Sequence, residues 1–423
     1  MNLKALTQLS ASEDSSIVLR SDELGHLRYY IISSTTNYSI VLEGHCEGEI
    51  PDDRPISFNI VLGSVAPLVD RGVEFYLKYD NGSLLFKTLD NSIVIHPLCV
   101  EHVSKNLMEL LDNYIKFTAA LRNLESTSTE IDKLRVKIET LETKKSSFIL
   151  DNFVPSTNDP FGNSDTDSKV DDFLEGLDSE LKELRRNIAT LSSRTVNMSP
   201  IENMDEFRRI STIAARHNKV VSMCGKFAVV QLTSGYIFQK CECGVRAVQG
   251  KLLSKLLAIK DGKFFDYEGS MVFHAKDNRT KDDSTTTVFI SAFMPSTKAD
   301  ETLITKGTVK EKYRLQLKSI FKTVSPILSK FDIMELDMGN ARLLLTNEGG
   351  ESVAVKFDVS DAKTLELNKL MRGEEAGEIT MSIIPIPKEL HTVLHHFDEN
   401  FTVYVKKNKY IIQSEGLYAV FGG

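Results

Sequence analysis

The sequence predicts an α+β fold in which a short repeat, one amphipathic helix followed by antiparallel strands, occurs about six times and is interrupted by a long helical hairpin. Three observations support this prediction. The helix-then-strands pattern recurs, the apolar spacing changes after residue 103, and tight-turn sequences join the strands. A period of about 40 residues is typical of architectures in which each repeat buries its apolar face against its neighbours.

The three clearest copies of the repeat lie toward the two ends of the chain. The C-terminal copy has a helix over 386–397 and strands over 401–421. A second copy, residues 315–358, begins with a helix at Leu315, and a third covers 56–97. In the third copy Asp80-Asn-Gly82 predicts a hairpin, because Asn-Gly suits the left-handed backbone of a type I′ turn.

The remaining copies are weaker but keep the same order. Strands are predicted over 16–20, 26–32 and 38–42, and helices over 205–217 and 251–258 each precede strands. Taken in pairs, the repeats give three domains separated by one insert. Their limits are 1–100, 199–297 and 298–423 for the domains and 101–198 for the insert.

The insert carries the apolar spacing of a coiled coil. Apolar residues from Leu107 to Leu141 recur close to every 3.5 residues, and those from Leu174 to Leu191 follow a strict alternation of three and four. Residues 155–168 between them are rich in turn-forming and acidic types, so we expect this stretch to be non-helical and mobile. The sequence therefore predicts a helical hairpin with a flexible acidic tip and a shorter second helix.

The formal net charge of −8 is unevenly distributed. Residues 151–180 carry nine acidic side chains and one basic one, and residues 1–100 carry thirteen against seven. Residues 205–263 carry eleven Lys and Arg against four acids, a net charge of +7. An acidic protein with one basic stretch is suited to bind a polyanion on a single surface.

No catalytic or metal-binding pattern is found in the sequence. The stretch 244–252 resembles a phosphate-binding loop, but its spacing is one residue too long and no Ser or Thr follows Lys251. Cys241 and Cys243 with Cys224 lack a second pair at metal spacing, so we interpret them as core residues. We therefore expect a protein that is not an enzyme and that has no cofactor.

Cysteine usage and hydropathy predict the compartment. Five cysteines, an odd number, favour a reducing environment. No signal-peptide pattern opens the chain, and no apolar run reaches the length of a membrane span. We expect a cytoplasmic protein without membrane contact.

Three domains, each made of two helix-plus-strand repeats, resemble the DNA sliding clamps of bacteria and their phages. The resemblance lies in repeat order and covers roughly 320 residues. It implies three clamp-like domains per chain and a dimeric ring around duplex DNA that acts as a processivity factor for DNA polymerase or transcription proteins. The coiled-coil insert departs from this family.

The resemblance also implies that the helices face the DNA, so each should be apolar on one side and basic on the other. Such residues would contact phosphates without reading bases. The candidate DNA-binding residues are Arg208, Arg209, Arg216, Lys219, Lys251, Lys255, Lys318, Lys322 and Lys388. His391 and His395 lie on the last helix with Lys388. The alternative interpretation is an ordinary solvated helix face.

For partner proteins, the resemblance implies a hydrophobic pocket beside the last strand of the third domain. Leu417, Tyr418, Val420 and Phe421 occupy this strand, and alternation should leave two of them partly exposed. The alternative is an ordinary edge strand. Two other functions stay open: a structural or assembly protein that oligomerises through the coiled coil, and an adaptor that keeps the clamp fold without encircling DNA.

Overall fold

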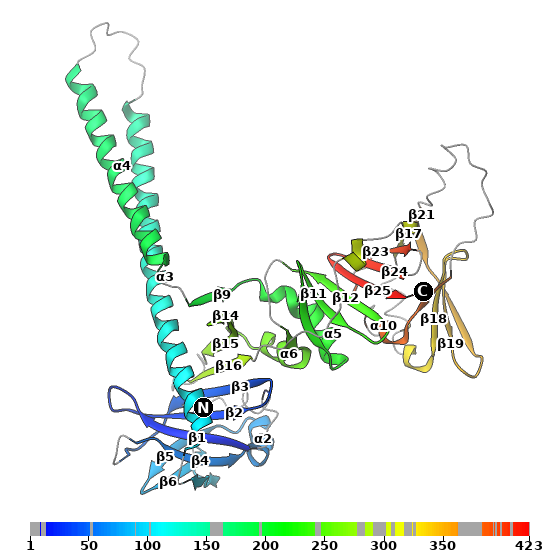
Figure 1. Ribbon diagram of the computed structural model, residues 1–423, viewed down its shortest axis with the longest axis horizontal. Helices are drawn as coiled ribbons and strands as arrows, with labels where there is room; N and C mark the ends of the chain where they lie inside the picture. Colours follow the sequence, from blue (N-terminus) through cyan, green and yellow to red (C-terminus); the bar gives the residue numbers. More distant parts are fainter. Residues whose placement is uncertain are drawn as a thin grey trace. The chain divides into compact units, whose positions relative to one another are not determined.

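The computed structural model describes the chain at residues 9, 14–50, 54–88, 90–100, 103–152, 164–193, 197–241, 247–276, 284–290, 302–305, 309–316, 324, 327–362, 383–391, 393, 396–397, 400–406 and 409–422. The chain divides into two compact units. The first unit comprises Met1–Cys99, Ile201–Phe264 and Met271–Gly423, and the second comprises Val100–Pro200 and Phe265–Ser270 (Figure 1).

Three groups of four strands in the first compact unit share one strand order. In each group three consecutive strands form a meander, and the first of them also pairs with a strand that comes later in the chain. The groups are β1 (Asp14–Ser21), β2 (Leu27–Ser34) and β3 (Tyr38–His45) with β4 (Ile56–Val61); β10 (Val220–Cys224), β11 (Phe227–Gln231) and β12 (Gly235–Lys240) with β13 (Val248–Gln249); and β18 (Ile333–Asp337), β19 (Arg342–Thr346) and β20 (Ser352–Lys356) with β22 (Ile383–Ile386). The orders β4-β1-β2-β3, β13-β10-β11-β12 and β22-β18-β19-β20 are the structural counterpart of the sequence repeat.

Three further meanders have three strands each. They are β5 (Phe75–Asp80), β6 (Ser83–Thr88) and β7 (Val94–Ile95); β14 (Lys263–Tyr267), β15 (Ser270–Lys276) and β16 (Thr285–Ile290); and β23 (Asn400–Lys406), β24 (Lys409–Ser414) and β25 (Leu417–Gly422). The last meander is extended by β17 (Val309–Gln316) and β21 (Asp358–Ala362), and β8 (Leu98–Val100) lies beside β4. The predicted hairpin at Asn81-Gly82 is confirmed, since both residues have positive φ, 49° and 82°.

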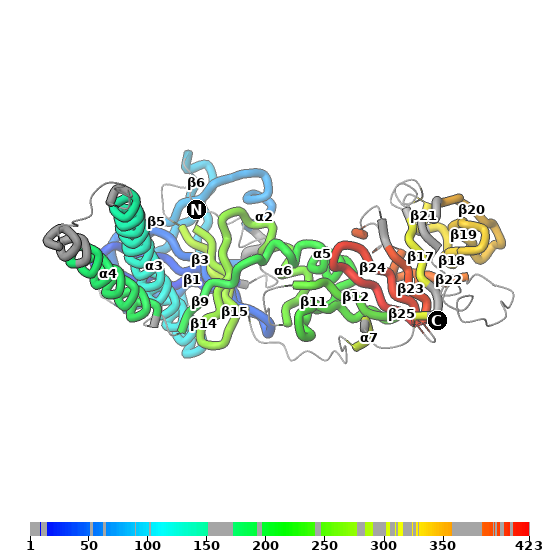
Figure 2. Tube along the Cα trace, turned by 90° about the horizontal axis from the view of Figure 1, so that it is seen from above, coloured from blue at the N-terminus to red at the C-terminus, as the bar shows by residue number. Residues whose placement is uncertain are grey.

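Two of the four-stranded groups continue edge to edge into a meander from a distant part of the sequence. β3 pairs antiparallel with β16, from Tyr38 opposite Ile290 to Glu43 opposite Thr285. β12 pairs in the same way with β25, from Gly235 opposite Phe421 to Gln239 opposite Leu417, and Figure 2 shows these two strands side by side. Each long sheet is therefore assembled from two sequence segments.

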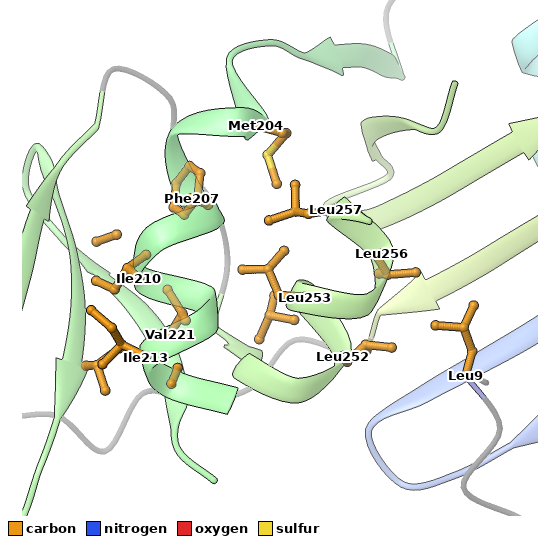
Figure 3. Packing of buried hydrophobic residues seen from close by; sticks show 14 of the residues in the cluster. Leu9, Met204, Phe207, Ile210, Ile213, Val221, Leu252, Leu253, Leu256 and Leu257 are labelled. Atoms are coloured by element: carbon orange, nitrogen blue, oxygen red, sulfur yellow. The ribbon is translucent and has the colours of Figure 1, made fainter. Parts of the chain in front are cut away.

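The helices of the first compact unit whose bounds are described are short. They are α2 (Leu62–Asp70), the 3₁₀ turn η1 (Met204–Phe207), α5 (Arg208–Arg216), α6 (Gly250–Leu257), α7 (Thr302–Thr305), the 3₁₀ turn η2 (Leu328–Lys330) and α10 (Lys388–His391). Helices α5 and α6 pack side by side with Phe207, Ile210, Leu253 and Leu257 among the buried side chains between them (Figure 3). Helix α5 also packs against β10, β11 and β12, so it covers one face of this sheet.

The second compact unit is built on two long helices, α3 (Lys105–Asn152) and α4 (Ser164–Ser193), which lie side by side in both views (Figures 1 and 2). Lys145 pairs with Asp178 at 2.5 Å, and Arg185 pairs with Glu142 at 2.7 Å. The strand β9 (Met198–Ile201) begins after α4. The later residue of α3, Lys145, pairs with the earlier residue of α4, Asp178, and the earlier Glu142 pairs with the later Arg185, so the helices are antiparallel. As predicted, α4 is the shorter helix.

Three predicted elements had wrong boundaries. The helix expected over 386–397 is limited to α10 (Lys388–His391) among the described residues, because Ile386 still belongs to strand β22. The helix expected to begin at Leu315 does not, because Leu315 and Gln316 end strand β17, where Leu315 is fully buried opposite Phe401 of β23. The stretch 155–168 was expected to be non-helical throughout, whereas α4 begins at Ser164. The sequence Ser164-Asp-Thr-Asp167 is itself typical of a helix start, since acidic residues are favourable in the first turn.

Candidate nucleic-acid and partner surfaces

The predicted basic residues of α5 and α6 lie on the sides of these helices that face away from the core. Arg208, Arg209 and Arg216 on α5 and Lys251 and Lys255 on α6 are all exposed. Their neighbours in sequence, among them Ile210, Ile213, Leu253 and Leu256, are buried at 1% exposure or less. The amphipathic pattern therefore separates an apolar and a basic side on each helix.

Three of the cations come from segments that touch each other. The backbone N–H of Gly250, which precedes Lys251, donates a hydrogen bond to the carbonyl of Lys219 at 2.9 Å. A side chain at Gly250 would overlap Ala214 and come within 2.7 Å of the backbone nitrogen of Ala215, next to Arg216. Only glycine permits this close approach of α6 to α5. It brings together the backbone segments that carry Arg216, Lys219 and Lys251, and we call these three residues the basic crossing.

The other cations of α5 lie at its opposite end. Arg208 and Arg209 are one helix length away, about 12 Å for eight residues. Arg208 pairs with Asp205 at 2.8 Å, and Arg209 approaches Glu415 at 4.0 Å. Both arginine side chains are at least 43% exposed in these pairs. Exposed ion pairs of this kind contribute about 0–1 kcal/mol, so a phosphate can compete for either guanidinium.

The remaining predicted cations are placed differently. Lys388 on α10 pairs with Asp332 at 2.7 Å, and this hydrogen bond lowers the pKa of Asp332 and raises the pKa of Lys388. Lys318, Lys322 and His395 lie outside the described residues. His391, expected on an exposed face, is 4% exposed, and its Nε2 lies 3.0 Å from the carbonyl of Ile386. Because burial lowers the pKa of His391, it is not part of a cationic surface.

Helix α10 is also connected to the turn between β11 and β12. The backbone N–H and the hydroxyl of Ser234 both donate to one carboxylate oxygen of Glu389, at 2.9 and 2.8 Å. Burial raises the pKa of Glu389, but the hydrogen bonds from Ser234 and Thr233 and the nearby His217 outweigh it, so the pKa is lowered. This contact joins residues 155 positions apart.

The C-terminal strand β25 is an interior strand, not an edge, because it lies between β12 and β24. The side chains of β25 alternate between the two sides of the sheet, as expected for a strand. Leu417 and Phe421 belong to the main core, while Tyr418 and Val420 face the opposite side. The expectation that two of the four would be partly exposed was wrong. Val420 is 4% exposed, and Tyr418 alone is partly exposed.

The side of the sheet opposite α5 carries a second apolar cluster, which we call the outer-face cluster. Its buried members are Val229, Phe238, Ile411 and Val420. Partly buried side chains pack against them, namely Cys224, Phe227, Tyr236, Leu303, Ile304, Tyr404 and Tyr418. The rings of Phe227 and Tyr418 meet edge to face at 5.8 Å. Sequence reasoning missed this cluster, although Phe227-Ala-Val-Val230 is apolar on both faces, which indicates a strand covered on both sides.

Two of the strands that end their sheets in the described part of the chain are β7 and β20. β7 has β6 as its sheet neighbour, and β20 has β19. Val94 of β7 is 40% exposed, and β20 alternates exposed residues with the half-buried Val353 and Val355. Edges of this kind present unpaired backbone groups that another strand can use.

No group of metal-ligating side chains occurs among the residues that the structure describes. Cys241 is buried and Cys224 half-buried, while Cys243 lies outside the described residues. None of the described helices combines the length and hydropathy that a membrane span needs.

By fold, the chain is similar to bacterial sliding clamps. The DNA polymerase III subunit beta from Pseudomonas aeruginosa matches with a TM-score of 0.52 and 10% identity, over 99% of this chain and 96% of that chain. The sliding clamp from Caulobacter crescentus matches with 0.52 and 11%, over 99% and 96%. The Helicobacter pylori beta clamp, crystallised with a DNA ligase peptide, matches with 0.52 and 10%, over 99% and 95%. At these identities the similarity establishes the fold alone. No protein-family model and no curated protein sequence matches the chain.

Proposed function

We propose that this protein is a DNA sliding clamp, in which two copies close a ring around duplex DNA and tether DNA polymerase or transcription proteins to it. The observation that carries the proposal is the rule by which the sheets are joined. The last strand of one four-stranded group pairs with the last strand of a meander, as β3 pairs with β16 and β12 with β25.

Within the described residues, the same rule leaves one strand of each kind without such a partner. Of the three last strands of four-stranded groups, β20 ends its sheet, and of the three last strands of meanders, β7 ends its sheet. With the three proposed domains, the four-stranded group of the first domain joins the meander of the second, and the four-stranded group of the second joins the meander of the third. The next step joins the third domain's group, through β20, to the first domain's meander, through β7 of another copy.

This contact is head to tail, because two different surfaces meet. Head-to-tail contacts form a ring when the rotation closes and a filament when it does not. Two copies place six domains in the cycle, the count that the resemblance implies, and this supports a closed dimer. The domain limits proposed from sequence, 1–100, 199–297 and 298–423, are compatible with this cycle.

The helix faces support the proposal of non-specific DNA binding. The basic crossing, together with Arg208, Arg209 and Lys255, offers cations that contact phosphates and carry no base-reading geometry. Lys318, Lys322 and Lys388 are proposed to extend this surface in the third domain. A surface that binds every sequence equally well allows sliding.

We propose that α3 and α4 form an antiparallel coiled-coil arm that serves a partner protein. Leu177 and Leu181 of α4 are buried, and Phe148 contacts Phe173 with ring centroids 4.4 Å apart. The apolar stripe is thus used within one chain, which favours a projecting arm over the alternative in which the coiled coil joins several chains.

The ring is tested by the change Val94→Glu, which places a carboxylate at the edge of β7. We expect it to weaken self-association at least tenfold in sedimentation equilibrium, since charged edge residues block strand pairing. Leu24→Glu is the matched control, because Leu24 is 81% exposed in the turn between β1 and β2, away from either edge.

Retention on DNA gives the second readout. The wild-type protein should stay on closed circular DNA after dilution and leave when the circle is cut, whereas Val94→Glu should leave both. A wild-type protein that is monomeric at micromolar concentration, or that ignores DNA topology, contradicts the clamp and favours the structural or adaptor function.

A further inference from the structure

Helix α7 sits on the outer-face cluster. Its residues Leu303 and Ile304 pack against the cluster that contains Val420, Phe238 and Ile411, and α7 contacts strand β25. Leu303 and Ile304 of the same chain therefore cover part of the surface beside the last strand. This explains why Val420 is buried although it points away from the main core.

Two lysines bind the backbone of this short helix. The ammonium of Lys406 donates to the carbonyl of Ile304 at 2.9 Å, and that of Lys409 donates to the carbonyl of Leu303. Lys406 and Lys409 are paired opposite each other at the start of the β23–β24 hairpin. Lys406 is 7% exposed, an unusual position for lysine.

The electrostatics of this pair favour an anion. Burial lowers the pKa of Lys406, and burial together with the neighbouring charge of Lys406 lowers the pKa of Lys409. Both ammonium groups donate to backbone carbonyls of α7, and a carboxylate in the place of those carbonyls would accept the same hydrogen bonds with the added attraction of opposite charges. Hydrogen bonds between ions are roughly twice as strong as neutral ones.

We propose that residues 302–305 occupy, within the chain, a docking site for a partner peptide that has two adjacent aliphatic residues followed directly by a carboxylate. The aliphatic pair takes the places of Leu303 and Ile304, and the carboxylate takes the place of the carbonyls bound by Lys406 and Lys409. The inference rests on the proposed function in one respect, because it treats the outer face of β25 as the partner surface.

The covering helix regulates access by competition. A partner binds only the fraction of molecules in which α7 has left the site, so its apparent affinity falls by that fraction. If α7 is docked in 99 of 100 molecules, the loss is about 100-fold. A partner whose carboxylate outcompetes the carbonyls recovers part of this loss.

The test uses three fluorescein-labelled hexapeptides and needs no DNA. The first ends in Leu-Ile with a free carboxylate, the second ends in Leu-Ile-Asp amide, and the third ends in Leu-Ile amide. Binding is measured by fluorescence anisotropy to the full-length wild type and to the double change Leu303→Ser with Ile304→Ser. The matched control is Ile333→Ser with Ile383→Ser, since these residues are 51% and 53% exposed on other strands.

We expect the change at 303 and 304 to tighten binding of both acidic peptides at least tenfold, and the control to leave it unchanged. The neutral peptide should bind at least tenfold more weakly than the acidic ones. Changing Lys406→Met with Lys409→Met should remove that preference. Equal binding by wild type and the 303/304 variant, or equal binding of acidic and neutral peptides, overturns the proposal.

A measurement on the wild type covers the case in which a variant does not fold. Saturating acidic peptide should speed amide hydrogen exchange at residues 302–305, because the peptide displaces the helix, and unchanged exchange overturns the proposal. Retention on circular DNA is scored separately. A negative result in the peptide experiments therefore contradicts the docking site and leaves the ring proposal intact. A negative result in the DNA experiment contradicts the ring and leaves the docking site intact.

Discussion

The two joined sheet edges and the two open ones are made of equivalent strands, yet their surroundings differ. At the β12–β25 junction, Leu417 and Phe421 are at most 2% exposed, and their strand is paired on both sides. At the open edges Val94 is 40% exposed, and both β7 and β20 end their sheets in the described part of the chain. A junction therefore stabilises the single chain, whereas an open edge contributes stability only when a second strand arrives.

The largest effect is expected at the closed junction itself. Gly235 begins β12 opposite Phe421, and a side chain there would overlap the carbonyl oxygen of Val420. The added methyl group would meet backbone atoms of β25, which cannot rotate away as a side chain can. Gly235→Ala must therefore push the two strands apart. We expect it to lower the free energy of unfolding by about 3 kcal/mol, measured by urea denaturation.

The matched change at an open edge is Ala354→Val in the middle of β20. Ala354 is exposed and sits on a strand whose outer side has no sheet partner among the described residues, so the larger side chain meets no neighbouring strand. Its effect on the unfolding free energy should stay within about 0.5 kcal/mol. Comparable losses in the two variants would mean that the junction is no tighter than the edge.

A second glycine, Gly250, extends the comparison from a strand junction to a helix contact, because it allows α6 to approach α5 closely. Gly250→Ala would push α6 away from Ala214 and Ala215. We expect a loss of about 1–2 kcal/mol after the helix-propensity gain of alanine is included. Gly176→Ala in α4 is the control of opposite sign. No atom lies within 4 Å of its added methyl group, so it should gain about 0.5–1 kcal/mol.

Sequence patterns predicted the parts of the fold that depend on local spacing. The turn at Asn81-Gly82, the helices α5 and α6 and the long helix pair follow from turn chemistry and apolar periodicity. Pairing between distant strands does not, because nothing local marks Glu43 as the neighbour of Thr285. Leu315 was assigned to a helix because a fully buried strand has the same apolar run as a helix stripe.

The candidate sites divide in the same way. The exposed cations on α5 and α6 were predictable from helix periodicity. Once the apolar residues show which side of the helix is buried, the residues on the other side must be exposed. The outer-face cluster was not predictable, because it needs Val229, Phe238 and Val420 to meet from three strands. The burial of Val420 depends on α7, more than a hundred residues away in sequence.

The next prediction separates DNA affinity from ring closure. Changing Arg208, Arg216 and Lys251 to Glu removes cations from α5 and α6 and leaves both open edges untouched. We expect the log–log salt dependence of DNA binding to become shallower by about 2.7, or 0.9 for each lost phosphate contact. The measurement is a salt titration by anisotropy with duplexes of two unrelated sequences.

The control for this experiment is charge reversal on α3 at Lys133, Arg135 and Lys137, which are exposed and change the net charge equally. It should leave the salt slope within experimental error. A dependence on the duplex sequence would contradict the phosphate-only interpretation. Self-association should be normal in both variants, in contrast to Val94→Glu.

The smallest effect is expected at the contact between Glu389 and Ser234, which supports the β12–β25 junction from the side. Because the folded pKa of Glu389 is lowered, its ionised form is favoured in the folded chain, and this stability is present above the ordinary pKa of 4.5. It is lost as the pH falls through the folded value. Burial also lowers the pKa of His217, so protonation of that ring favours unfolding below about 6.5. Both groups therefore make the chain less stable in acid.

The change Glu389→Gln removes the carboxylate and keeps His217 in place. At pH 7 it should cost about 1 kcal/mol, because the hydrogen bonds from Ser234 lose their charge and the site is partly open to water. Between pH 5.5 and 3.5 the variant should lose less stability than the wild type, and the two curves should converge in acid. Between pH 6.5 and 5.5 the variant should lose slightly more stability than the wild type, because the charge of Glu389, which raises the pKa of His217, is gone. Parallel curves at every pH would assign the acid sensitivity to His217 and leave Glu389 as a neutral hydrogen-bond acceptor.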